Sequence, residues 1–154
     1  MAFEVVSATE IAFTDDSSDS TPMVHVGMNI EDKVMMMKQM ARGARPKSTT
    51  LVYAVTRVGD GDLIDPLPWV SGEKFTFLDE REVCENAAAS AGLTLTSVHD
   101  HGEMTLEVFN KPSASPLPVN LGHLMGSDMP TMFGNLGESV NAGIMSSAIP
   151  EFAI

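Results

Sequence analysis

Alternating hydrophobic and polar positions in the first part of the chain predict β-strands. Over 3–13 the odd positions are mainly apolar, with Glu4 and Glu10 between them, a period of two typical of a strand. A polar run follows at 15–20, and the alternation resumes over 23–28. We therefore expect two strands that pair as a hairpin.

Two later segments have the spacing of amphipathic helices. Apolar residues recur every three or four positions over 30–42 and again over 79–92. Pro46 forbids continuation of the first helix, and Asp79 with Glu82 gives the second a capping-box pattern. We expect one helix in each segment.

The remaining pattern predicts a sheet. Residues 51–58 are almost continuously apolar or β-branched, as in a central strand covered on both faces, and 59–72 form a long loop. Alternation over 93–98 and 104–109 predicts a closing hairpin. The expected fold is therefore of the α+β class: a two-layer α/β sandwich with about five strands in a mixed sheet and two helices on one face.

The composition changes after Lys111. Residues 112–154 contain no Lys or Arg and are rich in Pro, Gly, Ser and Met, without a clear hydrophobic period. We expect a core domain over 1–111 and an extended, apolar, low-charge C-terminal arm over 112–154. The residues expected to dock this arm on a neighbouring subunit are Leu121, Leu124, Met125, Met129, Met132, Phe133 and Phe152.

Charge and cysteine content limit the partners and the compartment. The chain has 154 residues, 9 Lys and Arg against 21 Asp and Glu, and a net charge of -12. Such acidity argues against a surface wrapped by nucleic acid or an anionic membrane. The only cysteine, Cys84, lies on an apolar helical stripe, which predicts a buried and inert thiol. A reducing compartment is expected, and no signal peptide or membrane-spanning segment is recognised.

One cluster has the residue types of a metal site. His99, His101 and Glu103 lie at the tip of the predicted closing hairpin. Because side chains alternate along a strand, these three could point the same way and would then suit Zn, Mn or Fe, and His25 could approach from another strand. The alternative is a polar turn in which these side chains bind backbone groups.

A basic segment is a second candidate. Lys38, Arg42, Arg45 and Lys47 follow one another without an intervening acid. They predict a local contact with an anion or nucleic acid. The alternatives are stabilisation of a helix C-terminus by its cations and pairing with the acidic surface of another copy.

No catalytic motif is recognised: the sequence has no nucleophile elbow, phosphate-binding glycine loop or dinucleotide fingerprint. The leading hypothesis is therefore a non-enzymatic structural subunit of a viral particle, without a cofactor, located in the virion or cytoplasm. Its partners would be copies of itself or other subunits of a large assembly. The alternatives are a small metal-dependent protein or enzyme using the histidine cluster, and an accessory factor that contacts nucleic acid through the basic segment.

Overall fold

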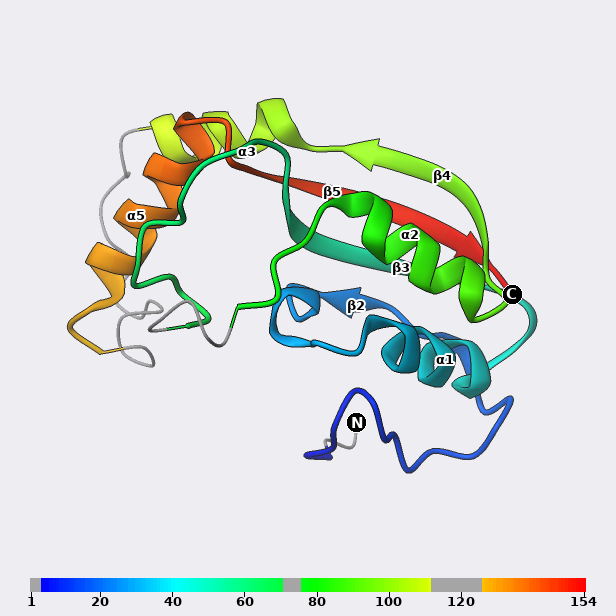
Figure 1. Cartoon of the computed structure of the whole chain (residues 1–154). Coiled ribbons are helices and arrows are strands. Elements are labelled where there is room, and N and C mark those ends of the chain that lie inside the picture. The colour runs from blue at the N-terminus through cyan, green and yellow to red at the C-terminus, as the bar shows by residue number, and fades with distance from the viewer. Residues whose placement is uncertain (1–3, 71–75, 112–125) are drawn as a thin grey trace.

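The computed structural model describes residues 4–70, 76–111 and 126–154 (Figure 1). The strands in this part of the chain are β1 (Ser18–Ser20), β2 (Met23–Val24), β3 (Ala44–Arg57), β4 (Thr94–Asp100) and β5 (Met145–Ala153). The helices are α1 (Lys33–Gly43), α2 (Arg81–Ser90), α3 (Gly102–Asn110) and α5 (Met129–Asn141), with a short 3-10 helix, η1 (Gly27–Asn29).

The strands form one mixed sheet in the order β1-β3-β5-β4, with β2 also paired to β3. The short strands β1 and β2 run parallel to β3, and β5 runs antiparallel to both β3 and β4. Consequently β3 and β4 are parallel to each other although β5 lies between them. The predicted α/β fold with a mixed sheet of about five strands is confirmed.

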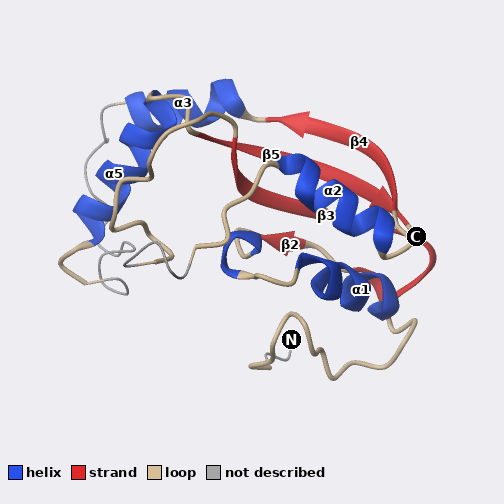
Figure 2. Ribbon diagram, viewed as in Figure 1, coloured by secondary structure: helices blue, strands red, loops and turns tan. Residues whose placement is uncertain are grey.

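The first hydrophobic core lies on the sheet face covered by α1 and α2, as expected (Figure 2). Alternate β3 residues such as Val52 and Ala54 face these helices, and Phe152 of β5 is fully buried beside them. Met36 and Met37 of α1 fill the space between helix and sheet, since an unbranched thioether adapts to irregular gaps.

A second core lies at the end of the sheet where β3 and β4 finish and β5 begins (Figure 1). Its buried members are Met28, Leu67, Val70, Leu78, Leu136, Val140, Ile144 and Met145. They bring the long loop after β3 against α5 and the start of β5. None of the helices in the described ranges is long and apolar enough to cross a membrane.

The predicted strand over 3–13 and its hairpin are wrong. From residue 4 onward this segment forms only an isolated bridge between Ser7 and Glu10. Its backbone is held instead by α1: the Arg42 guanidinium donates to the carbonyls of Ile11 and Phe13, each at 2.6 Å. An alternating pattern requires a neighbouring strand to become a strand, and here the neighbour is a helix end.

The second strand of the predicted closing hairpin is also wrong, because 104–109 lies in α3. A short alternating segment also has apolar residues four positions apart, as Met104 and Val108 are. Such a segment therefore fits both the two-residue period of a strand and the 3.6-residue period of a helix. The Asp100 carboxylate accepts a hydrogen bond from the Gly102 N–H at 2.7 Å, next to the start of the helix.

The described part of the expected C-terminal arm is not extended: most of it forms α5 and β5. Residues 145–153 form an internal strand that pairs with β3 on one side and β4 on the other. Residues 129–141 form α5, which packs on α3 and β5 of the same chain. Residues 112–125 lie outside the described residues. Part of the segment expected to reach a neighbour is thus needed to complete its own sheet.

Candidate functional site

A cavity of about 640 Å³ opens beside β2 and β3, against α3 and α5. Its polar lining residues are His25, Tyr53, Thr105, Ser146 and Ser147. Its apolar lining residues are Met28, Val55, Pro68, Trp69, Met104, Val108, Phe109, Phe133, Leu136 and Val140. We call it the apolar cavity. None of the described residues that line it has a carboxylate, ammonium or guanidinium group.

The mouth of the apolar cavity is marked by His25, the residue after β2. Its φ of 51° lies in the left-handed region, where a residue other than glycine is strained. Its N–H donates to the Tyr53 carbonyl at 2.7 Å, which holds the strained backbone against β3. Asp16 and Lys47 also have positive φ, but of these three residues only His25 lines the cavity.

The environment of His25 favours a neutral ring. The imidazole and the Tyr53 ring lie with their centroids 4.3 Å apart. His25 is exposed at the surface, but its ring is partly desolvated. Because desolvation disfavours the imidazolium, the pKa of His25 lies below the ordinary 6.5. At neutral pH His25 therefore offers an unprotonated nitrogen at the cavity mouth.

A second histidine, His101, also lies near Tyr53. The His101 ring is 6.0 Å from the Tyr53 ring, centroid to centroid, at the start of α3. Thr105 fixes this helix to β5: its hydroxyl is 2.6 Å from the Ser147 hydroxyl and donates to the His101 carbonyl at 2.8 Å. These hydrogen bonds hold the start of α3, which contributes Thr105 to the polar lining, against β5.

The apolar wall is held by packing between helices and loop. The Trp69 indole N–H donates to the Thr76 hydroxyl at 3.2 Å, which orients the ring at the cavity. Phe109 of α3 packs on Gly137 of α5, where a methyl group would lie only 3.0 Å from the phenyl ring. The cavity wall therefore depends on a close approach of α3 and α5.

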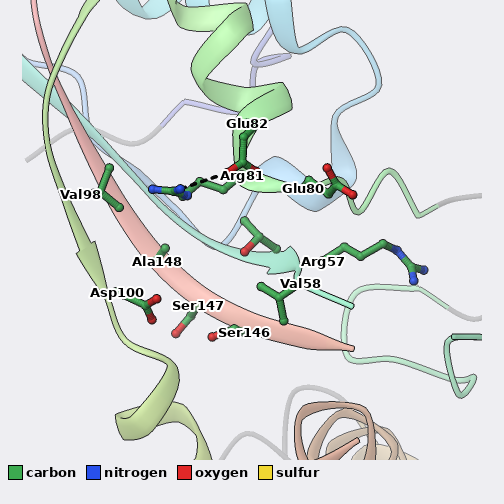
Figure 3. A pocket seen from close by; sticks show the side chains of 11 residues that line it. Arg57, Val58, Glu80, Arg81, Glu82, Val98, Asp100, Ser146, Ser147 and Ala148 are labelled. Carbon is green, nitrogen blue, oxygen red and sulfur yellow. Dashed lines mark hydrogen bonds and ion pairs between the residues drawn. The ribbon is translucent and has the colours of Figure 1, made fainter. Parts of the chain in front are cut away.

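A second, polar hollow of about 310 Å³ lies near the start of α2 and is lined in part by Ser146 and Ser147 (Figure 3). Its two arginines are already engaged. Arg81 pairs with Glu82, and Arg57 donates to backbone carbonyls of the loop that follows β3. We favour the apolar cavity as the candidate site because it is larger and is lined by aromatic side chains.

The predicted metal ligands are not gathered into one cluster. His99 is exposed on β4, with its Nε2 atom 3.6 Å from a Glu151 carboxylate oxygen. His101 faces Tyr53, and Glu103 is exposed in the first turn of α3. No group of three metal-binding side chains occurs within the residues that the structure describes. The structure instead places His101 and His25 against the same tyrosine.

The predicted basic segment divides into two exposed lysines and two arginines engaged within the chain. Arg42 pairs with Asp15 at 2.6 Å, and Arg45 pairs with Asp19. Lys38 and Lys47 are exposed on α1 and at the start of β3. Arg42 holds the N-terminal segment against the end of α1, and Arg45 holds it against the start of β3. Binding of nucleic acid by the basic segment stays a prediction.

The structure describes four of the seven predicted docking residues. Leu121, Leu124 and Met125 lie outside the described residues. Met129 and Met132 are half-buried on α5, Phe133 lines the apolar cavity, and Phe152 belongs to the first core. Association with copies of itself or other subunits stays a prediction.

Sequence reasoning missed the cavity because it assigned α3 to a strand. The one available signal was His25, which directly follows a strand-forming pair and was expected to approach His101. The inert thiol was anticipated: burial raises the pKa of Cys84 to about 11, so this residue supplies no nucleophile at neutral pH.

No protein-family model and no curated protein matches the sequence. Solved methyltransferases share its fold. A putative sarcosine dimethylglycine methyltransferase from Galdieria sulphuraria superposes with a TM-score of 0.73 at 16% identity, over 96% of this chain and 57% of that one. Geranyl diphosphate C-methyltransferase from Streptomyces coelicolor A3(2) gives 0.70 at 13% identity, over 97% and 52%. Phosphoethanolamine N-methyltransferase 2 from Haemonchus contortus gives 0.68 at 15% identity, over 96% and 35%.

These likenesses establish the fold and overturn part of the sequence interpretation. The expected non-enzymatic subunit of a viral particle is contradicted, because the solved structures on which the chain superposes are enzymes, among them several methyltransferases and a [4+2]-cyclase. The expected absence of an organic cofactor is contradicted as well, since such structures contain S-adenosylmethionine or S-adenosylhomocysteine. The chain spans about half the length of the first of these proteins.

The described residues do not by themselves fit S-adenosylmethionine. That molecule carries a sulfonium and an amino-acid group, and the apolar cavity has no charged lining residue to pair with them. Nucleotide sites on parallel sheets also use a glycine-rich turn after a strand. After β2 the chain has only Gly27, which lies in η1, and the two glycines that follow β3, Gly59 and Gly61, lie against Gly143 and Ile144. We therefore assign the apolar cavity to a different molecule.

Proposed function

We propose that this chain provides the acceptor-binding part of an S-adenosylmethionine-dependent methyltransferase. The observation that carries the proposal is the uncharged cavity at the end of β2 with His25 at its mouth. Ligands on sheets with parallel strands bind outside the carboxyl ends of those strands, and β2 ends one residue before His25. The fold shared with solved methyltransferases supports the reaction class.

The residues of the cavity divide the work of binding and proton transfer. The apolar wall formed by Trp69, Phe109 and Phe133 binds the body of the acceptor and excludes water from it. The neutral His25 ring accepts the proton of the acceptor's nucleophilic group, the role of a general base. Cys84 takes no part because it is buried on the other face of the sheet.

Binding of an apolar probe tests the function. The chain has one tryptophan, so in a ¹⁵N-labelled sample its indole N–H gives a single resonance that reports on the apolar cavity. We expect 4-methylbiphenyl to shift this resonance saturably. Val55→Glu, at a half-buried position of the lining, places a carboxylate in the cavity and should weaken binding at least about tenfold, since an unpaired charge is costly in an apolar site. Val83→Glu on α2, outside the cavity, is the matched control.

A competition experiment distinguishes an acceptor site from a donor site. S-adenosylhomocysteine, titrated into the complex with 4-methylbiphenyl, should leave the Trp69 resonance in its bound position. Displacement of the biphenyl by this nucleoside would assign the cavity to the methyl donor and end the proposal. An indole resonance that never responds to 4-methylbiphenyl would have the same consequence.

A further inference from the structure

The lining of the apolar cavity excludes ionic ligands. The polar groups that the described residues place in the lining are hydroxyls, the imidazole of His25 and the phenol of Tyr53, and none of them is a carboxylate, ammonium or guanidinium group. A carboxylate, phosphate or ammonium group would lose its hydration there without gaining an ionic partner, at a cost of several kcal/mol on the order of the usual desolvation penalty. A ligand that fits this site is uncharged.

The shape and chemistry of the wall favour an aromatic ligand. Trp69, Phe109 and Phe133 line one cavity together with the Tyr53 ring, and aromatic rings pack on one another with an advantage of about 1 kcal/mol beyond area alone. The volume of about 640 Å³ is typical of sites for small molecules with more than one ring.

Among the polar groups of the described lining, only His25 is suited to accept a proton. The Thr105 hydroxyl is occupied by the His101 carbonyl and by Ser147. A neutral imidazole of lowered pKa is a weak base, and proton transfer to it is most favourable from an acid whose pKa lies near its own. Phenols and enols, with pKa values of about 10 for a simple phenol, satisfy this better than aliphatic alcohols.

Resting on the proposed function, we infer that the acceptor is an uncharged aromatic molecule whose polar group is an acidic hydroxyl, phenolic or enolic, that donates its hydrogen bond to His25. The aromatic body lies against Trp69 and the phenylalanines, and the hydroxyl oxygen faces the cavity mouth. The hydroxyl is thereby held at the only ring nitrogen that the described lining offers as a base.

Three matched biphenyls test this inference by the shift of the Trp69 indole resonance. They are 4-phenylphenol, 4-methylbiphenyl, in which a methyl group replaces the hydroxyl, and biphenyl-4-carboxylate. We expect 4-phenylphenol to bind about threefold to tenfold more tightly than 4-methylbiphenyl, the effect of one net hydrogen bond. The carboxylate should bind at least about tenfold more weakly than either.

Two asparagine variants locate the hydroxyl. His25→Asn keeps a residue that tolerates positive φ but removes the imidazole, and it should reduce the ratio of phenol to methyl affinity to about one. His99→Asn changes an exposed histidine outside the cavity and should leave the ratio unchanged. The ¹⁵N spectrum of each variant checks that it is folded.

Each outcome has one consequence. Equal affinity of wild type for the phenol and the methyl compound overturns the inference but leaves the apolar site, and with it the proposed function, intact. A phenol preference that survives in folded His25→Asn also overturns the inference. Tight binding of the carboxylate overturns the exclusion of ions. If none of the three biphenyls moves the Trp69 resonance, the proposed function fails as well.

Discussion

At the scale of single residues, His25 combines an unusual backbone conformation with close contacts to Tyr53. Its backbone is left-handed, its N–H is bonded to Tyr53, and its ring packs on the Tyr53 ring at the cavity mouth. A strained residue persists only when its surroundings determine its conformation, and β3 supplies that constraint. The strain is local evidence for a site that no sequence motif announced.

The lowered pKa of His25 predicts a dependence of stability on pH. Unfolded chains bind the proton as pH falls through the ordinary value of 6.5, whereas the folded chain binds it only at lower pH. This contribution to the free energy of unfolding is therefore fully present above pH 6.5 and is lost as pH falls through the lowered pKa. Urea unfolding at about pH 7.5 and about pH 5.5 should show a larger loss for wild type than for His25→Asn. Equal losses would mean that burial does not affect this group.

At the scale of elements, the packing of α3 on α5 shapes the site. Both helices contribute cavity-lining residues, and they meet where Phe109 covers Gly137. The absence of a side chain at Gly137 allows the phenyl ring to approach the backbone of α5. The wall of the cavity is therefore set by one small residue on one helix and one large residue on the other.

Two glycines of α5 offer a matched test of this contact. Gly134→Ala adds a methyl group where no atom lies within 4 Å and should stabilise the chain by about 0.5–1 kcal/mol through helix propensity. Gly137→Ala gains the same propensity but presses on Phe109, so its free energy of unfolding should be about 1–3 kcal/mol below that of Gly134→Ala. Urea unfolding measures both. Equal stabilities would show that α3 does not pack closely on α5 in solution.

At the scale of the whole molecule, the last strand of the chain, β5, occupies an interior position in the sheet. β5 lies between β3 and β4, and residues of both cores, Phe152 and Met145, belong to it. The two parallel strands on either side of β5 are joined through it rather than to each other. The first and last parts of the described chain therefore share one sheet and both cores.

Truncation after Asn110 tests this arrangement. The shortened chain lacks α5 and β5, so β3 and β4 lose the partner strand that each requires and the first core loses Phe152. We expect no cooperative urea transition and no dispersed amide spectrum from it. A truncated chain that unfolds cooperatively would show that residues 1–110 form an independent domain, as the change in composition after Lys111 predicts.

The sequence by itself determined the helices α1 and α2 and the face on which they pack, because hydrophobic periodicity over ten or more residues favours one arrangement. It also determined the second half of β3, where a continuous apolar run predicts a central strand, but not the first half from Ala44 onward. Tertiary structure alone decided the rest. Pro150 argues locally against an internal strand, yet β5 forms one because two strands distant in sequence pair with it. The alternating segments at 3–13 and 104–109 became loop and helix when their neighbours were a helix end and α5. The candidate site belongs to this second group, since His25, Trp69 and Phe133 meet only through long-range packing whose free energy no local pattern encodes.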